Sequence, residues 1–274
     1  MDGMPSARSA AAAQPLLNTR LLNDRLVAPG RLWTDIRSVA TTGSTNADVM
    51  RLARAGAPDG LVIAAETQTA GRGRQGRSWH SEPGSALMFS LLVRPRSVAQ
   101  ACLGWLPLLA GVATATAVRS ITGVRACLKW PNDVLIEDGK LAGILAERSG
   151  DAVVVGIGLN VLGRPDGLPV PTATSLEFHG ARDTDRAQLL AEVLGEFERW
   201  YLAWADAGGD ADASGVRARY LRLCRTIGKQ VNVTLPGGRT LSGVATDVDA
   251  SGQLIVESGT EAVAVSAGDV IHVR

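Results

Sequence analysis

The segment GRGRQGR (residues 71–77) places three arginines in a glycine-rich run between two short apolar stretches that are expected to be strands. Glycine lets the backbone turn several N–H groups toward one anion, and each arginine adds a permanent positive charge. We predict a loop that binds a carboxylate and a phosphate together. Because glycine makes it flexible, we also predict a lid that is mobile without ligand and orders on binding to exclude water from a reactive intermediate.

Two other interpretations of this segment are weaker. Residues 71–76 match GxGxxG, but in a dinucleotide-binding fold the third glycine opens a helix, whereas the residues that follow here (RSWHSEPG, 77–84) are typical of a loop. The arginines also resemble an RGG-like strip that pairs with phosphates and stacks on bases. A single short copy argues against that interpretation.

Lys129 and Lys140 flank a predicted β-hairpin that has Gly139 in its turn, and Asn132 and Asp133 lie between the two lysines. Lysine ammonium groups neutralise charge that develops on phosphoryl oxygens, and an aspartate can hold Mg²⁺ bound to a nucleotide. A lysine in a hairpin is usually only a solvated surface residue. Together with the arginine loop, however, the hairpin favours an adenylating site.

Four motifs, GRGRQGRSW, KWPNDVLI, GKLAGILAE and GIGLNV, occur in an order and spacing that resemble those of biotin-protein ligases. They are preceded by a Ser-Thr-Asn triplet, which is expected to cap a helix ending at Gly56, and by Gln68. The resemblance runs from about Ser44 to Asn160. It implies an α+β fold, with a mixed sheet flanked by helices as in class II aminoacyl-tRNA synthetases and biotin ligases, and a small C-terminal SH3-like β-barrel.

The resemblance implies an ATP-dependent ligase. The carboxylate of biotin would attack the α-phosphate of ATP to give biotinyl-5'-AMP and diphosphate. A lysine of a biotin carboxyl carrier domain, such as that of acetyl-CoA carboxylase, would then attack the mixed anhydride. The implied small molecules are therefore biotin as substrate and ATP with Mg²⁺, and the implied protein partner is the carrier domain.

The same resemblance assigns roles to individual residues of this sequence. The residues implied to bind biotin are Ser44, Thr45, Asn46, Gln68, Gly71, Arg72, Gly73, Arg74, Lys140 and Gly143. Those implied to bind ATP or the adenylate are Arg74, Arg77, Trp79, Lys129, Asn132, Asp133, Lys140 and Asn160. The catalytic residues would be Arg74, Lys129 and Lys140, and Asp133 would face magnesium through ATP. Trp79 and Trp130 would pack against biotin or adenine, and a structural role explains each of them at least as readily.

Composition bounds the alternatives. The chain has 274 residues and a net charge of +1, so it has no overall field that would attract DNA or an anionic membrane. The apolar stretch Leu103–Val118 contains a proline and two threonines and is predicted to be a core helix. Without an apparent export signal or paired cysteines, we expect a cytoplasmic protein without a metal site built from protein ligands alone.

Predicted domain boundaries follow changes in pattern. Residues 1–30 are expected to be an N-terminal extension, partly disordered or forming one short helix, with the catalytic domain at 31–225 and the barrel at 226–274. Since longer members of the family carry an N-terminal DNA-binding domain and about 40 residues before Ser44 are too few for one, we expect a ligase without repressor activity.

Two rival functions remain at the level of sequence. A lipoate-protein ligase or octanoyltransferase would share the fold, but its acyl chain offers no ureido donors for the triplet and Gln68 to bind. The other rival is a non-catalytic biotin-sensing or RNA-binding module, which predicts no turnover. Oligomeric state, order of substrate binding and the carrier docking surface do not follow from the sequence.

Overall fold

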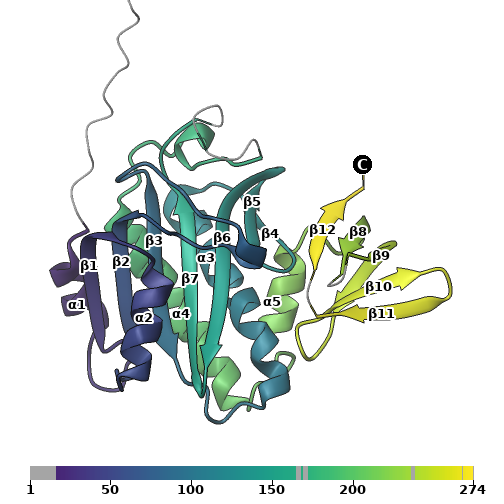
Figure 1. The fold of residues 1–274 in the computed structure, drawn as a ribbon, viewed down its shortest axis with the longest axis horizontal. Coiled ribbons are helices and arrows are strands. Elements are labelled where there is room, and N and C mark those ends of the chain that lie inside the picture. The colour runs from purple at the N-terminus through teal and green to yellow at the C-terminus, as the bar shows by residue number, and fades with distance from the viewer. Residues whose placement is uncertain (1–16, 165–167, 169–171, 236–237, 267, 274) are drawn as a thin grey trace, which may run out of the picture.

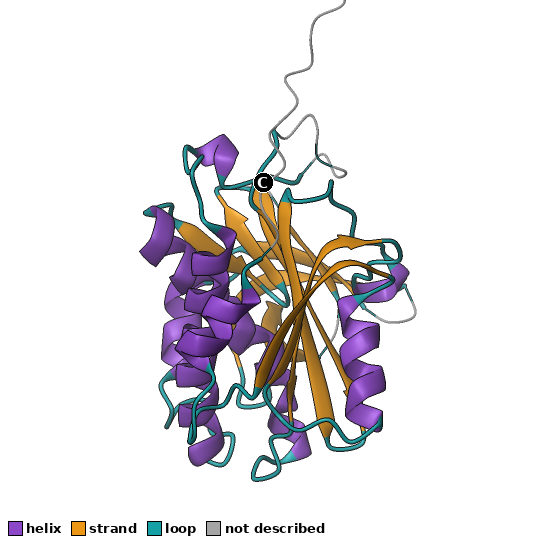
Figure 2. Cartoon of the chain, turned by 90° about the vertical axis from the view of Figure 1, so that its left-hand side faces the viewer, coloured by secondary structure: helices purple, strands orange, loops and turns teal. Residues whose placement is uncertain are grey.

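The computed structural model describes residues 17–164, 168, 172–235, 238–266 and 268–273. A seven-stranded mixed sheet carries helices on both faces, and a five-stranded sheet lies beside it (Figures 1 and 2). Strands β1 and β2 are parallel, and all other neighbours in the large sheet are antiparallel. In spatial order, the large sheet contains β1 (Asp35–Thr42), β2 (Leu61–Gln68), β3 (Ala86–Val93), β7 (Ala152–Asn160), β6 (Gly139–Ser149), β5 (Asp133–Ile136) and β4 (Ala126–Lys129).

The helices divide between the two faces of this sheet. Helix α2 packs on β2, β3 and β7, whereas α3, α4 and α5 form a layer on the opposite face (Figure 2). The α-helices are α1 (Thr19–Leu26), α2 (Thr45–Arg54), α3 (Trp105–Thr122), α4 (Arg186–Asp206) and α5 (Val216–Leu223), and short 3₁₀ turns are η1 (Arg74–Gly76), η2 (Gln100–Gly104) and η4 (Glu177–His179). The predicted α+β class is thereby confirmed.

Alternation along the strands explains why both faces are covered. In β2, Leu61 and Ile63 pack under α2, while Val62 and Ala64 join the larger core under α3 and α4. Successive side chains of a strand point to opposite faces, so a strand that is apolar throughout needs a layer on each side. Central strand β3, buried at all eight positions, shows the same requirement.

The helical stretch Gln100–Thr122, which contains α3, is long and apolar enough to be a membrane span by length and composition alone, but most of it is buried inside the protein. It packs against α4, α5 and four strands of the sheet. Such burial is the mark of a core helix, because a span would expose its side chains to lipid.

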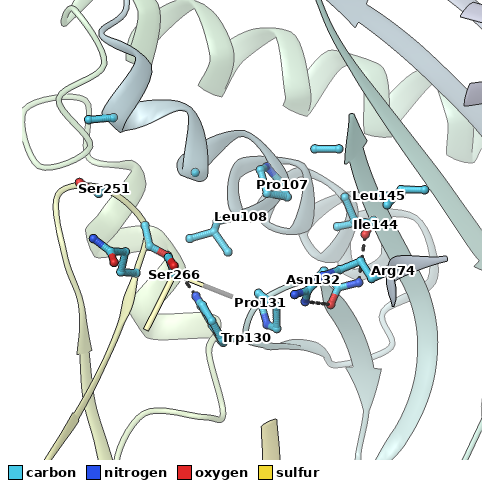
Figure 3. A pocket seen from close by; sticks show the side chains of 15 residues that line it. Arg74, Pro107, Leu108, Trp130, Pro131, Asn132, Ile144, Leu145, Ser251 and Ser266 are labelled. Carbon is cyan, nitrogen blue, oxygen red and sulfur yellow. Dashed lines mark hydrogen bonds between the residues drawn. The ribbon is translucent and has the colours of Figure 1, made fainter. Parts of the chain in front are cut away.

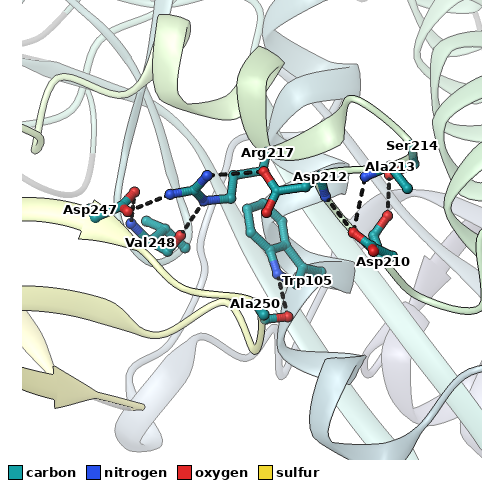
Figure 4. A network of polar contacts seen from close by, with 9 residues as sticks. All are labelled: Trp105, Asp210, Asp212, Ala213, Ser214, Arg217, Asp247, Val248 and Ala250. Atoms are coloured by element: carbon teal, nitrogen blue, oxygen red, sulfur yellow. Dashed lines mark hydrogen bonds and ion pairs between the residues drawn. The ribbon is translucent and has the colours of Figure 1, made fainter.

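The C-terminal sheet is antiparallel throughout and has the spatial order β11, β10, β9, β8, β12. Its strands are β8 (Gln230–Thr234), β9 (Thr240–Val248), β10 (Leu254–Ser258), β11 (Glu261–Val265) and β12 (Asp269–His272). Arg217 of α5 joins it to the helical layer of the large sheet by donating to the Val248 carbonyl over 2.7 Å and pairing with Asp247 (Figure 4). Trp105 adds a bond of 3.0 Å from Nε1 to the Ala250 carbonyl.

The predicted hairpin forms between β5 and β6, but its turn residues are Glu137 and Asp138, and Gly139 is already in β6. Glu137, with φ of 53°, adopts the left-handed conformation there, so placing Gly139 in the turn was wrong. Most of the predicted N-terminal extension, residues 1–16, lies outside the described residues, and α1 forms the short helix expected after it.

Candidate active site

A cavity of about 500 Å³ lies between α2, the loop of residues 71–77, the strands β5, β6 and β7, and strand β12 of the C-terminal sheet. Every predicted site residue except Gly71 lines it. Gly71 is buried just behind, where its carbonyl accepts a hydrogen bond of 2.9 Å from the Trp79 N–H. The sequence therefore located one contiguous site from segments more than 100 residues apart.

One end of the cavity is neutral, polar and buried. Ser44 is the N-cap of α2, and the Thr45 N–H and hydroxyl lie 2.8 and 3.2 Å from Gln68 Oε1. A buried hydroxyl, Ser90 Oγ of β3, lies 2.7 Å from Thr45 Oγ1. These groups hold one another in position before any ligand arrives, as a polar pocket for a small head group requires.

Asn46 has a structural role at this end of the cavity, where it hydrogen-bonds to neighbouring strands. Its amide nitrogen donates to the Leu145 carbonyl over 3.2 Å and to Glu147 Oε2 over 2.8 Å, and Ser90 Oγ lies 2.6 Å from its Oδ1. Both N–H donors are thus used inside the protein. A β-carbon added at Gly156 would lie only 2.0 Å from Asn46 Oδ1, so this glycine is required for Asn46 to lie against β7.

Trp79 lies on a glycine floor formed by paired residues of β6 and β7. Gly143 and Gly158 are opposite each other in the sheet, and a β-carbon on Gly158 would lie 2.4 Å from Trp79 Cε2. A β-carbon on Gly143 would lie 3.2 Å from Trp79 Cζ3. Glycine inside a strand commonly marks such a close approach. The flat indole consequently forms one wall of the cavity.

The arginine loop folds back on itself over the cavity. Gly73 N–H donates to the Arg77 carbonyl over 2.6 Å, and Arg72 and Ser78 form an isolated β-bridge. Gly76, the third glycine of the GxGxxG match, has φ of 73° and ends a single 3₁₀ turn. No α-helix begins at Gly76, and the next regular element along the chain is strand β3, so the rejection of a dinucleotide fingerprint is confirmed. Mobility of the loop without ligand stays a prediction.

Positive charge collects at the other end of the cavity. Among its lining residues, five cationic side chains, Arg72, Arg74, Arg77, Lys129 and Lys140, face a single carboxylate, Asp133. Lys140 Nζ lies 2.6 Å from Asp133 Oδ1, and Lys129 is the cross-strand neighbour of Asp133. Glu147, which lies outside the lining, pairs with Arg72, so positive charge still exceeds negative charge here and the end is suited to a polyanion.

Burial makes this charge costly in the absence of a ligand. It is the largest cause lowering the pKa of Arg74, and Arg77 lowers that pKa further while Asp133 opposes the change. The pKa of Lys129 is also lowered, first by burial and then by Lys140 and Arg77, against Asp133. Since a bound anion would favour the charged forms, the site gains electrostatically when a phosphate enters.

Hydrogen bonds position the cationic residues. Arg74 Nη1 donates to Asn132 Oδ1 over 2.9 Å, and Asn132 Nδ2 in turn donates to the Ile144 carbonyl over 3.0 Å. Asn160 is buried, and its Nδ2 donates to the Thr174 carbonyl over 2.9 Å. That bond holds residues 172–174 against Lys140, whose N–H donates to the Thr172 carbonyl. Asn132 and Asn160 therefore organise this end.

The C-terminal sheet closes the site. Val270 and Ile271 of β12 line the cavity, and the Gly268 carbonyl lies 3.5 Å from Arg74 Nη2. Trp130 is buried and structural, since its Nε1 donates to the Gly252 carbonyl over 3.1 Å. Beside it lies a second cavity of about 450 Å³ at the junction with α3, which shares Arg74 and Asn132 with the first (Figure 3).

The chain matches known proteins along most of its length. Residues 39–161 match the biotin/lipoate A/B protein ligase family, and residues 226–273 match the biotin protein ligase C-terminal domain. A biotin--[acetyl-CoA-carboxylase] ligase from Mycobacterium tuberculosis is 44% identical over 265 residues, covering 95% of this chain and 97% of that protein. The chain belongs to the biotin protein ligase family.

Two further relatives agree with this assignment. A biotin--[acetyl-CoA-carboxylase] ligase from Paracoccus denitrificans is 35% identical, and the match covers 85% of this chain and 98% of that protein. The structure of a biotin protein ligase from Aquifex aeolicus in complex with biotin and ATP superposes with a TM-score of 0.75 at 27% identity, covering 88% of this chain and all of that one. The chain is thus a ligase, and its C-terminal sheet corresponds to the SH3-like domain of the family.

For a biotin protein ligase, the structure adds site residues that the sequence reasoning did not single out. They come from β3, β6, β7 and β12 and are Ser90, Glu147, Gly156, Gly158, Val270 and Ile271. Alternate glycines in the predicted strand of residues 151–158 could have indicated a close approach. Ser90 and Glu147 carried no signal, because each is an ordinary strand residue until the fold brings Asn46 to it.

Proposed function

We propose that this ligase activates biotin with ATP and transfers it to a lysine of a biotin carboxyl carrier domain. The observation that carries the proposal is the polarity of one cavity, which is neutral and hydrogen-bonding at the Thr45 end and cationic at the Lys140 end. Biotin has the matching polarity, with a neutral ureido head and a carboxylate tail. The names of the Mycobacterium and Paracoccus relatives support the same substrate.

The ureido group presents a carbonyl acceptor and two N–H donors. Ser44, Thr45 and Gln68 would bind it, while Asn46, whose N–H groups are engaged, would hold Thr45 and the start of α2 in place. A polar pocket of this kind rejects a purely apolar acyl chain, because the chain would leave its donors unpaired. This argument disfavours lipoate and octanoate as substrates.

In the first step, a carboxylate oxygen of biotin attacks the α-phosphorus, and the bond to the β-phosphate oxygen breaks to release diphosphate. Arg72, Gly73 and Arg74 would bring the carboxylate and α-phosphate together, and Lys140 would contact the oxygen that joins them. Lys129, Arg77 and Asn132 would face the remaining phosphates. Positive groups already in place spare the reorganisation that water would require as charge develops.

In the second step, the neutral amine of the carrier lysine attacks the acyl carbon, an amide forms and AMP leaves. The amine loses a proton, and the AMP phosphate takes up the charge of the broken anhydride. Arg74 and Lys140 would stabilise that leaving group as they stabilised its formation. The arginine loop and Trp79 would exclude water, which otherwise hydrolyses the adenylate.

Magnesium would enter with ATP. Among the described residues, no group of three or more His, Cys, Asp or Glu side chains could hold a metal ion. Asp133 supplies one carboxylate at the phosphate end, and Mg²⁺ commonly takes one or two carboxylates together with phosphate oxygens and water. Asp133 would therefore be its protein ligand. We place the enzyme in the cytoplasm, where a carboxylase would meet it.

The test is pyrophosphate exchange into ATP with biotin, lipoate or octanoate, followed by transfer of labelled acid to a carrier domain. We expect exchange with biotin and transfer to the carrier but none to a carrier whose acceptor lysine is changed to arginine. Exchange with lipoate alone, or with none of the three acids, would contradict the proposal.

A further inference from the structure

An unbroken chain of polar contacts links the neutral end of the cavity to the arginine loop. It runs through Gln68 of β2, Thr45 and Asn46 of α2, Ser90 of β3, Glu147 of β6 and Arg72 of the loop. Every contact in it measures 3.0 Å or less. Two members, Ser90 and Glu147, lie outside the cavity lining, so the reaction itself does not explain them.

Glu147 connects the two halves of this series of polar contacts. Its Oε2 accepts from Asn46 Nδ2 over 2.8 Å and from Arg72 Nη2 over 3.0 Å. One carboxylate oxygen thus holds the loop on one side and the start of α2 on the other. The Glu147 side chain is 29% exposed and that of Arg72 is 48% exposed, so solvent partly screens their ion pair, and Glu147 acts mainly by holding its two partners in position.

Ser90 fixes the direction of the chain. The hydroxyl is fully buried and has a single proton, yet it lies within 2.7 Å of both Thr45 Oγ1 and Asn46 Oδ1. Since Asn46 Oδ1 can only accept, Ser90 donates to it and accepts from Thr45. Thr45 then has no proton left for Gln68, and the Gln68 amide oxygen is held by the Thr45 N–H. A ligand that draws the Thr45 hydroxyl away from Ser90 would therefore change the hydrogen bonding of the group that also holds Asn46.

We propose that Glu147, supported by Ser90, is a positioning residue that couples occupation of the head-group pocket to closure of the arginine loop. The inference rests on the proposed function, because it takes biotin as the ligand of that pocket. It assigns Glu147 no contact with the reacting atoms. Its effect is that the loop closes on a pocket whose head-group end is correctly filled, which protects the adenylate only when biotin is the acid.

Trypsin provides a direct readout, because Arg72, Arg74 and Arg77 are cleavage sites within the loop. Cleavage after these residues, identified by mass spectrometry, is measured with and without saturating biotin, and biotin affinity is measured by calorimetry. In the wild type, we expect biotin to slow loop cleavage. In Glu147→Gln saturated with biotin, we expect cleavage about threefold faster than in the wild type, the loss that follows from weakening one partly exposed ion pair.

Ser90→Ala is nearly isosteric and breaks the chain at a different link, so it should give the same loss of protection. If the chain acts as a unit, the double variant Ser90→Ala/Glu147→Gln is no worse than either single variant. The matched control is Glu257→Gln, on an exposed position of the C-terminal sheet, which should behave as the wild type.

Glu147→Ala is included because a glutamine at position 147 can still accept a hydrogen bond from Arg72. Equal biotin-dependent protection in wild type, Glu147→Gln and Glu147→Ala would overturn the coupling, as would a wild-type loop that biotin leaves unprotected. A wild type that neither binds biotin nor supports exchange would instead refute the proposed function. The two failures are therefore distinguishable in one set of samples.

Discussion

The two ends of the cavity are built on opposite principles. At the head-group end, buried neutral groups such as Thr45, Asn46 and Ser90 satisfy one another, whereas at the phosphate end five cationic side chains line the cavity with Asp133, and Glu147 pairs with one of them, Arg72. The first end is complete without a ligand, and the second is electrostatically unbalanced until an anion arrives. The contrast teaches that the neutral end is preorganised by hydrogen bonds within the protein, while the cationic end holds positive charge that a bound anion would balance.

The largest loss of activity is expected from a substitution at the cationic end of the cavity. Lys140→Ala removes the ammonium group beside Asp133 and leaves that carboxylate facing the phosphates. We expect biotin-dependent pyrophosphate exchange to fall by about 10²- to 10³-fold, as for loss of one preorganised donor in other enzymes. The matched control is Lys229→Ala, which removes an exposed lysine just before β8 and should retain activity. If Lys140→Ala unfolds, its role is structural.

A smaller effect, on biotin affinity, is expected when Trp79, which forms one wall of the cavity, is displaced. In Gly158→Ala, the added β-carbon would lie 2.4 Å from Trp79 Cε2, so the indole must move into the cavity. We expect biotin to bind about tenfold more weakly in calorimetry. Gly195→Ala in α4 meets no atom within 4 Å and should leave binding unchanged. Unaltered affinity in Gly158→Ala would show that Trp79 does not border the biotin site.

The smallest expected change is in the KM for ATP, and it depends on pH. Burial, with help from Lys140 and Arg77, lowers the pKa of Lys129, so this ammonium loses its proton at a lower pH than an exposed lysine does. As pH rises through that pKa, the KM for ATP should increase by about threefold, because only the charged form of Lys129 attracts phosphate. Stability moves the other way, since protonated Lys129 is penalised by burial and the penalty disappears at higher pH.

Lys129→Arg separates these effects. The guanidinium keeps its charge at alkaline pH, so the rise in KM should flatten in this variant and persist in Lys229→Arg. The measurement is the KM for ATP at a series of alkaline pH values, with thermal unfolding followed in parallel. An identical pH profile in Lys129→Arg would assign the titration to another group.

Much of this site was predictable because its local signals are strong. Ser44 as a helix cap, the arginine loop and the hairpin between Lys129 and Lys140 each depend on neighbours within about ten residues, where sequence patterns are informative. The misplaced turn at Gly139 has a local cause as well, since Glu137 takes the left-handed position that glycine usually occupies.

The remainder depends on contacts that are distant in sequence. Glu147 meets Asn46 across 101 positions, and Gly158 is needed only because Trp79 lies on it. The contribution of β12, nearly 200 residues beyond Arg74, likewise follows from the docking of the C-terminal sheet. Asn46, expected to bind biotin directly, spends both amide N–H donors on Leu145 and Glu147, so a direct contact would have to use its oxygen.

The central claim is that one cavity recognises a neutral head group and activates the carboxylate attached to it. Its most direct test is the amount of acyl-adenylate that the enzyme retains after mixing with excess ATP and either biotin or lipoate, without a carrier, followed by rapid desalting. The account predicts a stoichiometric amount of retained biotinyl-AMP, no lipoyl-AMP, and almost none of either in Arg74→Ala. Retention of lipoyl-AMP at the same level, or of biotinyl-AMP at wild-type level in Arg74→Ala, would contradict it.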